Sequence, residues 1–507
     1  MPILGENPKI YPYFKFEGYT KAGKPQDWKV IELENEYIKT WVLPQVGGKV
    51  WGAIEKVSGQ EFIYRNEVMK FRNIAMRGPW TSGGIEFNFG IIGHTPATAT
   101  PVDYLLETHA DGSVSCIVGA MDLPSRTQWR VRIKLPKDKA YFETEALWYN
   151  PTPLHQSYYN WMTAAAAAKE DLAFYCPGDK YVTHPGDARP YPIEYGRNIA
   201  QYSQNNFLGS KSYHVVGAYN DFFGGYFQQQ QYGFGHWALY DEMPGQKLWI
   251  WALSRAGGIW EDLLTDSDGQ YIEFQAGRLF NQYAPSANIN PISQATFTPH
   301  TTDQWRELWF PVLGIGGLTD VSPNGVLHVE DKAGKLVFGV NALAASADVL
   351  TIRSGNKVVY EQKINLQPLQ FFKDSIAISG DWQITLPNMD LAFNSNPDAL
   401  RIARPFHSPN LTAIPLFESN FRAGVEAMEF RDYVGAKSLL EACLKDNPAH
   451  LEALSHLAEL HYIQAEYDKG LQYALTALAI DTYHPQANYV AGILYKAKSD
   501  WLNAKEH

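Results

Sequence analysis

The stretch WRVRIKLPKDKAYFETEALWY (residues 129–149) decides the fold class of the longest part of the chain. Apolar and polar residues alternate along it on both sides of a turn rich in Lys and Pro. A period of two indicates strands with one buried and one wet face. The same alternation occurs in residues 29–34 and 37–43, and Gly-Gly, Asp-Gly and Asn-Pro steps separate such segments. We therefore predict a large antiparallel β-sandwich over residues 1–318.

A shorter run of alternating segments follows in residues 325–386, with turn signals at Asp331-Lys332-Ala333-Gly334. It predicts a small accessory β-sandwich over residues 319–390. Residues 391–414 contain several Pro and Asn and are predicted to form a linker.

An internal repeat with a period of 34 dominates the C-terminal part of the chain. Small residues that let two helices approach closely, and an aromatic residue at the turn, are typical of tetratricopeptide repeats. We therefore predict an all-α tetratricopeptide array over residues 415–507, with a surface for a protein partner or for self-association. The third repeat stops inside its second helix, so we expect the natural chain to continue. The repeating columns are Gly424, Ala458 and Gly492; Tyr433, Tyr467 and Trp501; and Ala436, Gly470 and Ala504.

Charge and composition narrow the possible partners. The 507 residues carry a net charge of −11, which repels a nucleic-acid backbone. The three cysteines are far apart in sequence and support neither a disulfide framework nor a zinc site. The sequence has no apolar run long enough to span a membrane and no signal peptide, so we expect a cytoplasmic protein without a membrane partner. A periplasmic location remains open if a signal peptide was removed.

Motifs for nucleotides and metals are missing from the sequence. There is no P-loop, no Gly-x-Gly-x-x-Gly before a helix and no His-Glu-x-x-His. Asp266-Ser267-Asp268-Gly269 is similar to half of a calcium loop but lacks its distal Glu. We therefore predict no cofactor and no metal.

The densest polar and aromatic segment is GPWTSGGIEFNFG (residues 78–90). Glu86 and Asn88 are two residues apart and share a strand face. Trp80, Phe87 and Phe89 could desolvate the Glu86 carboxyl and raise its pKa toward that of a general acid. The alternative is a structural Glu in a β-bulge.

A second constellation lies in YIEFQAGRLFNQ (residues 271–282). Tyr271, Glu273 and Gln275 fall on one strand face, where they would suit sugar hydroxyls. The alternative is the wet outer face of a sandwich strand. Glu86, Glu273 and Glu261 are the candidates for the two carboxylates that a glycosidase needs.

Further residues are candidates for holding a sugar. Trp161 also fits plain core packing, which we weigh as the alternative. The candidates for binding hydroxyls are His94, Asp103, Asn88, Gln275 and Arg278, and those for contacting sugar rings are Trp80, Trp161, Trp260 and Tyr271.

The segments at 78–90, 93–96 (GHTP) and 271–282 resemble an uncharacterised bacterial domain family whose members carry this domain ahead of tetratricopeptide repeats. That family is similar to the galactose mutarotase-like super-sandwich, which also serves sugar epimerases, lyases and parts of glycoside hydrolases. The resemblance implies a base at Glu273. In the stretch that should carry the acid His, residues 158–161, this chain has Tyr instead. It therefore implies sugar binding with carboxylate chemistry rather than simple anomer interconversion.

Three functional hypotheses follow. The first is a glycoside hydrolase or transglycosylase in which Glu86 and Glu273 act as acid and base or nucleophile, with Glu261 in reserve. The second is a non-catalytic saccharide-binding or scaffold protein with a peptide-binding helical array. The third is a sugar epimerase that combines Glu273 with a different acid. The first requires Glu86 and Glu273 to meet over one aromatic-walled hollow.

Overall fold

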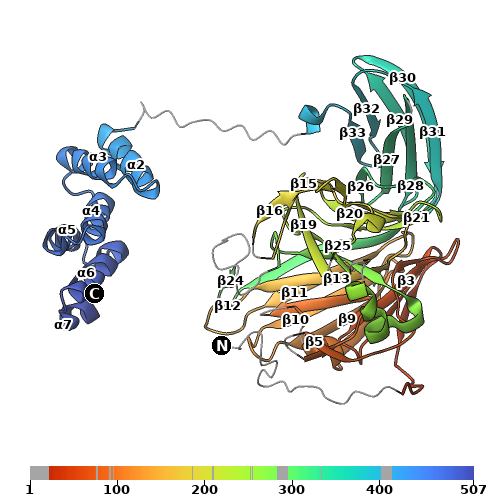
Figure 1. Cartoon of the computed structure of the whole chain (residues 1–507), viewed down its shortest axis with the longest axis horizontal. Coiled ribbons are helices and arrows are strands. Elements are labelled where there is room, and N and C mark those ends of the chain that lie inside the picture. The colour runs from red at the N-terminus through yellow and green to blue at the C-terminus, as the bar shows by residue number, and fades with distance from the viewer. Residues whose placement is uncertain are drawn as a thin grey trace. The chain divides into compact units, whose positions relative to one another are not determined.

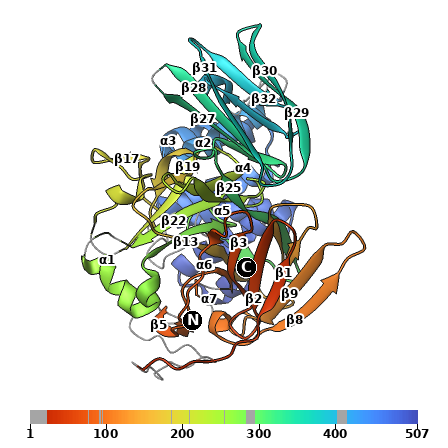
Figure 2. The same ribbon diagram turned by 90° about the vertical axis from the view of Figure 1, so that its right-hand side faces the viewer.

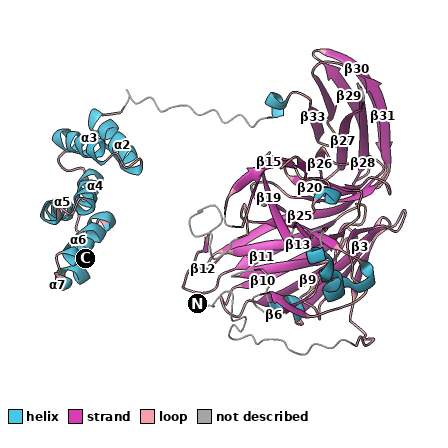
Figure 3. Cartoon of the chain, in the orientation of Figure 1, coloured by secondary structure: helices cyan, strands magenta, loops and turns pink. Residues whose placement is uncertain are grey.

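The computed structural model describes residues 22–75, 78–90, 93–94, 96–184, 186–207, 210–251, 253, 255–282, 295–332, 334–400 and 414–507. The chain divides into two compact units, residues 1–402 and residues 403–507. The first unit is built almost entirely of strands and the second of helices (Figure 3). This is the predicted fold class of β super-sandwich, small β-sandwich and helical repeats.

Two antiparallel sheets form the large sandwich of the first unit (Figure 1). The larger sheet has the order β1 (Ile31–Glu34), β2 (Ile38–Leu43), β3 (Lys49–Glu55), β7 (Ile85–Gly90), β13 (Tyr159–Ala167), β23 (Tyr271–Gly277), β22 (Gly245–Trp251), β19 (Ser210–Gly217), β15 (Gly178–Val182) and β16 (Ala188–Pro190), and β4 (Glu61–Ile63) also pairs with β3. The facing sheet has the order β14 (Leu172–Tyr175), β20 (Phe222–Phe227), β21 (Tyr232–Trp237), β25 (Thr302–Leu313), β11 (Phe142–Tyr149), β10 (Gln128–Leu135), β9 (Val114–Met121) and β8 (Asp103–Thr108).

The stretch at 129–149 forms the neighbouring strands β10 and β11, in which Trp129 lies opposite Trp148. Both indoles point into the core between the sheets and are buried. Phe89 of the larger sheet stacks on Trp129 with ring centroids 5.0 Å apart. The predicted alternation is therefore confirmed, because every second residue of these strands contributes to the core.

Short elements complete the large sandwich. They are the pairs β5 (Arg72–Ala75) with β6 (Gly78–Trp80), β12 (Gln156–Ser157) with β24 (Thr296–Phe297) and β17 (Ile193–Glu194) with β18 (Arg197–Asn198), and the turns η1 (Pro96–Ala99) and η2 (Tyr202–Gln204). A helical segment, residues 255–268, consists of α1 (Arg255–Trp260), η3 (Glu261–Thr265) and η4 (Asp266–Asp268). Figure 2 shows α1 at the flank of the large sandwich.

The small sandwich follows in the chain and stacks two sheets around its own apolar core. Backbone hydrogen bonds tie it to the large sandwich: the N–H of Ala140 donates to the C=O of Leu343 over 2.8 Å. Its sheets are β26 (Asp320–Ser322), β27 (Gly325–Lys332), β28 (Lys335–Ala342) and β31 (Phe371–Ala377), and β30 (Lys357–Leu366), β29 (Ser346–Ser354), β32 (Trp382–Leu386) and β33 (Leu391–Asn394), after which comes the turn η6 (Pro397–Leu400).

The second unit is a row of helix pairs with the predicted period. Tyr433, Tyr467 and Trp501 are the first residues of the second helix in each pair. A Cβ atom on Gly470 would lie 2.9 Å from the Leu494 side chain, which confirms that the small residues permit close helix contact. The helices are α2 (Leu416–Glu429), α3 (Tyr433–Asp446), α4 (Leu451–Ile463), α5 (Tyr467–Ile480), α6 (Pro485–Ala497) and α7 (Trp501–Glu506). Within the described residues, no helix has the length and apolar character that a membrane crossing needs.

Candidate functional site

A row of polar residues crosses the larger sheet on the face opposite to the sandwich core. Register partners on neighbouring strands place them side by side, and the pairing of Val50 with Ile85 brings Lys49 next to Glu86. The core-facing residues alternate with them, as Phe87 and Phe274 illustrate. From β3 to β19 the row, called the polar row below, is Lys49, Glu86, Thr163, Gln275, Lys247 and His214.

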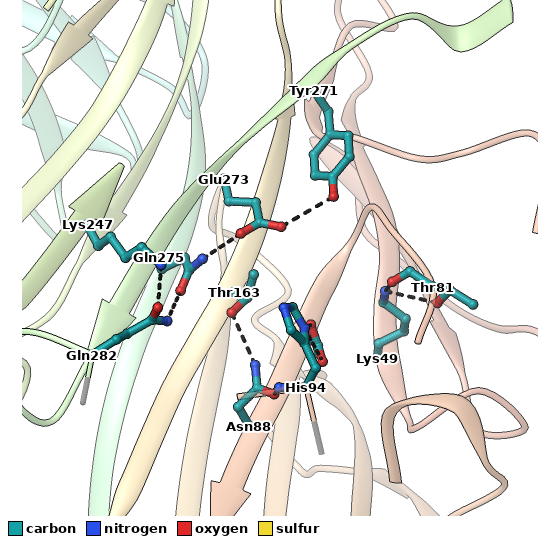
Figure 4. Close-up of polar contacts among 11 residues, drawn as sticks. Lys49, Thr81, Asn88, His94, Thr163, Lys247, Tyr271, Glu273, Gln275 and Gln282 are labelled. Carbon is teal, nitrogen blue, oxygen red and sulfur yellow. Dashed lines mark hydrogen bonds and ion pairs between the residues drawn. The ribbon is translucent and has the colours of Figure 1, made fainter. Parts of the chain in front are cut away.

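Glu273 and Tyr271 lie on the same face of β23 as Gln275. Glu86 and Glu273 are therefore on one face, with β13 between their strands. Standard sheet geometry puts their Cα atoms about 10 Å apart across the strands and about 7 Å apart along them. Thr163 of β13 lies between Glu273 on one side and His94 and Asn88 on the other (Figure 4).

Other parts of the chain cover this face and shield it from solvent. The side chains of the polar row and Glu273 are at most 6% exposed. An aromatic cluster that includes Tyr64, Trp80, Trp251 and Tyr271 packs over the Glu273 end together with Leu264 of the helical segment 255–268. The alternative of a solvent-facing strand surface is wrong for β23, because loops from other parts of the chain close over it.

Glu86 is held by an imidazole. His94 Nδ1 lies 2.9 Å from Glu86 Oε2 and 3.1 Å from Oε1. The His94 ring stacks on Trp80 with centroids 4.6 Å apart, and its backbone N–H donates to Asn88 Oδ1 over 2.6 Å. The backbone of His94 has a φ of 55°, a left-handed conformation that is uncommon for a non-glycine residue. Such strain occurs where the surroundings specify one position for a side chain.

The paired glycines before β7 permit this arrangement. Gly84 has a φ of 68°, and a Cβ atom there would lie 2.1 Å from the carbonyl oxygen of Val50. Only glycine allows the two backbones to approach so closely.

The pKa of Glu86 is lowered, which corrects the expected increase. Burial by itself raises this pKa, but the charge and hydrogen bond of His94 and the charge of Lys49 outweigh it. Phe87 and Phe89 belong to the sandwich core and do not flank the carboxylate. The same pairing raises the pKa of His94, although burial opposes the charged imidazolium.

Glu273 has the opposite electrostatic environment. Burial raises its pKa, and the negative charge of Glu86 adds to this effect, against His94 and Lys247. Its Oε2 accepts from Gln275 Nε2 over 2.5 Å, and its Oε1 accepts from the Tyr271 hydroxyl over 3.3 Å. The two carboxylates of the face thus differ in protonation tendency.

Two buried lysines of the polar row were not predicted. Burial lowers the pKa of Lys49 to about 8 and that of Lys247 to about 7. Lys49 donates to the carbonyl oxygen of Thr81 over 3.0 Å, and Lys247 donates to Gln282 Oε1. The available signal was a lysine inside a strand of large apolar residues, as in GQKLWIW (residues 245–251).

Three predicted site residues lie away from these carboxylates. Asp103 is exposed at the start of β8, the edge strand of the facing sheet. Arg278 forms an ion pair with Asp303 over 2.8 Å. Glu261 lies in the helical segment 255–268, and no hydrogen bond or ion pair within the described residues joins it to Glu86 or Glu273.

Two of the aromatic residues that were predicted to contact sugar rings pack against other residues of the protein instead. Trp161 is fully buried, and its indole lies against Gly277 and Gly245, where a Cβ atom would come within 2.5 and 2.8 Å. It lies on the face of the polar row, edge-on to His214 with ring centroids 5.6 Å apart, and offers no free surface to a sugar. Trp260 stacks on Trp251 with centroids 4.3 Å apart. Within the described residues no group of three or more His, Cys, Asp or Glu side chains could hold a metal ion.

Comparison with protein families assigns residues 6–312 to a domain of unknown function, DUF5107. This match covers more than half of the chain. The chain belongs to the DUF5107 family. The segments at 78–90 and 271–282, which suggested the relationship, both lie inside the matched region of this family.

Solved structures are similar to this chain at low sequence identity. A tetratricopeptide-domain protein from Parabacteroides distasonis is 19% identical, covers 98% of this chain with 82% of its own length, and has a TM-score of 0.54. A putative aldose 1-epimerase from Klebsiella pneumoniae is 11% identical and covers 54% of this chain with 76% of its own length, at a TM-score of 0.41. A galactose mutarotase-like protein from Lactobacillus casei is 11% identical and covers 56% of this chain with its full length, also at 0.41.

Proposed function

We propose that this DUF5107 protein is a carbohydrate-active enzyme that cleaves or transfers glycosidic bonds at the polar row. The observation that carries the proposal is the pair Glu86 and Glu273. They share one face, and their surroundings shift their pKa values in opposite directions. Two carboxyl groups with separated pKa values are the arrangement in which one acts as acid and the other as base.

The directions of the two pKa shifts assign the roles of general acid and general base. Glu273 has the raised pKa and serves as the general acid that protonates the leaving oxygen. Glu86 stays ionised against His94 and serves as the base that activates water or an acceptor hydroxyl. Strand β13 lies between their strands, which favours the wider carboxyl separation typical of inverting enzymes.

The side chains that cover this face suit the binding of a sugar. The aromatic cluster at the Glu273 end offers apolar ring faces, which suit the C–H faces of sugars. Trp251 Nε1 is buried and has no hydrogen-bond partner among the described residues. A buried donor without an acceptor is costly, and a sugar hydroxyl would satisfy it.

His94 marks the entrance to the site. Its side chain is 30% exposed, while that of Glu86 is 3% exposed. A substrate would reach the two carboxylates past His94, and the helical segment 255–268 would have to move from the Glu273 end.

The test is a panel of oligosaccharides incubated with the full chain and analysed by mass spectrometry for cleaved or extended products. Glu273→Gln and Glu86→Gln should each lower turnover by about 100-fold or more, because each removes one proton-transfer group. Glu143→Gln is the matched control: Glu143 is a buried carboxyl with a raised pKa on the facing sheet. Nuclear magnetic resonance of the first product should show an inverted anomeric configuration. Unchanged turnover in Glu273→Gln would refute the assignment.

A second candidate is a sugar epimerase, and the position of His94 favours it. His94 has a raised pKa and interacts electrostatically with Glu273 as well as with Glu86. An imidazolium acid and a carboxylate base on one face are the groups that anomer interconversion needs. This candidate predicts equilibration of free monosaccharide anomers through opening and closing of the sugar ring, lost in His94→Gln, without cleavage of glycosidic bonds. Binding without either reaction would instead support the non-catalytic saccharide-binding alternative.

A further inference from the structure

Lys247 is a buried lysine that forms no direct ion pair with any described residue, although the charge of Glu273 acts on it through space. It lies on β22 between Gln275 and His214 in the register of the sheet, and it is 2% exposed. Among the described residues, no carboxylate oxygen lies within 4.0 Å of its Nζ atom. Lys211 on the adjacent strand β19 differs, because it forms an ion pair with Glu194.

His214, the register neighbour of Lys247 on β19, has no ring nitrogen left to accept a proton from it. His214 Nδ1 donates to the carbonyl oxygen of Val182 over 2.7 Å, and its Nε2 accepts the backbone N–H of Gln282 over 3.1 Å. Both ring nitrogens are therefore occupied in the neutral form. An ammonium group has three donors, and the contact with Gln282 Oε1 uses one of them.

The amide chain beside Lys247 has a defined direction. Gln282 accepts from Lys247 and donates from Nε2 to Gln275 Oε1 over 2.5 Å, and Gln275 in turn donates to Glu273 (Figure 4). Each amide therefore makes a hydrogen bond to both of its neighbours in the chain. Turning either amide toward Lys247 would break a hydrogen bond in the chain that ends at Glu273.

The same face holds a second buried lysine that forms no direct ion pair within the described part of the chain. Lys49 at the other end of the polar row donates to Thr81 and also has no carboxylate oxygen within 4.0 Å among the described residues. The chain is strongly acidic overall, at −11, so cations at a buried site do not follow from composition. Burying an uncompensated charge is costly, and a ligand of opposite charge removes that cost.

We infer that the saccharide taken by this site carries an anionic group, and that Lys247 binds it beside Glu273. This inference rests on the proposed function and specifies its substrate class. The carboxylate of a uronic acid and the sulfate ester of a sulfated sugar present the same chemistry to an ammonium group, and the experiment separates them.

The experiment measures binding by calorimetry with the full chain carrying Glu273→Gln, so that ligands are not consumed. The probes are size-matched oligosaccharides: oligogalacturonides, neutral galactan oligosaccharides and sulfated galactan oligosaccharides. We expect one acidic class to bind at least 10-fold more tightly than the neutral class. Adding Lys247→Met should abolish that preference, Lys247→Arg should retain it, and Lys211→Met should leave it unchanged.

The outcomes separate this inference from the function on which it rests. Binding and turnover of neutral sugars without preference for an acidic class would overturn the inference and leave the proposed function standing. A preference that survives Lys247→Met in a folded variant would also overturn it. Binding of an acidic class without turnover by the unmodified chain would support the ligand class and refute the catalytic proposal. Failure of every saccharide class to bind would overturn both.

Discussion

At the scale of single residues, the neighbours of a side chain decide its protonation more than its residue type does. Glu86 and Glu273 are the same residue type on the same face, yet the charge of His94 lowers the pKa of Glu86, whereas burial raises that of Glu273. Some of these neighbours are close in sequence and others are distant, and His94 follows Glu86 by eight positions. Lys49 precedes Glu86 by 37 positions, and Lys247 lies on a different strand from Glu273.

The Glu86–His94 pair should make stability depend on pH. The raised pKa of His94 stabilises the fold fully below the unfolded value of 6.5, and this contribution is lost as the pH rises through the folded value. The lowered pKa of Glu86 stabilises above 4.5, and this contribution is lost as the pH falls through its folded value. The pair therefore contributes most between pH 4.5 and 6.5. His94→Gln should cost about 1 kcal/mol more at pH 5.5 than at pH 9, measured by urea unfolding. Equal losses at both values would contradict the pairing.

Gly277 should tolerate no side chain. A Cβ atom there would meet the Trp161 indole at 2.5 Å, and the indole is itself enclosed. Gly277→Ala should therefore lower the free energy of unfolding by about 2 kcal/mol. Gly258→Ala is the control, since a Cβ atom at that helical position meets nothing within 4 Å, and it should be neutral or stabilising. A Gly277→Ala protein as stable as the original would show that Trp161 is not held as described.

At the scale of elements, the helical segment 255–268 is the part that covers the Glu273 end of the face. Leu264 packs into the aromatic cluster, while the outer contacts are polar. Lys70 donates to the carbonyl oxygen of Asp262 over 2.8 Å and pairs with Asp266, and Arg72 Nε donates to that of Leu263 over 2.7 Å. Partly exposed polar contacts of this kind contribute little individually, so the segment is a local unit that can open without unfolding the sheet.

Lys70→Met should loosen this segment selectively. We expect amide hydrogen exchange in residues 255–268 to accelerate several-fold, while strands β13 and β23 keep their protection and global stability changes by less than about 1 kcal/mol. Lys169→Met is the control, because Lys169 is a surface lysine that contacts Gln230 instead. Exchange that is unchanged by Lys70→Met would mean that the contacts of Lys70 do not hold the segment.

At the scale of the whole molecule, two compact units share one chain, and each has its own core. The aliphatic and Ala-rich contacts between helix pairs belong to residues 403–507, whereas the aromatic core belongs to residues 1–402. Cores of this size unfold as separate cooperative units when few contacts join them. A protein partner or self-association through the helical array stays a prediction.

Calorimetry should therefore resolve two transitions. Gly470→Leu forces a side chain against Leu494 and the carbonyl oxygen of Ala458, 3.0 Å from the Cβ position, and should lower only the transition of the helical unit. Gly492→Ala is the control, because its nearest contact would be an ordinary 3.5 Å. A shift of both transitions in Gly470→Leu would show that the units unfold together.

Local periodicity was enough to predict the elements and the fold class. The alternation in residues 129–149 predicts strands because each strand sees one apolar and one polar environment, and the 34-residue repeat predicts helix pairs because each pair needs the same small residues. The same local rule placed Tyr271, Glu273 and Gln275 on one face. It also placed Glu86 and Asn88 together on one strand face.

Only the tertiary structure decided which side chains meet and what covers them. Asp103 is exposed on an edge strand, Arg278 pairs with Asp303, and Trp161 is buried against glycines of β22 and β23. Lys49 of the polar row comes from β3, which sequence order does not reveal as the neighbour of β7. Charge and burial depend on distances through space, which strand pairing across the sheet sets and the local sequence does not encode.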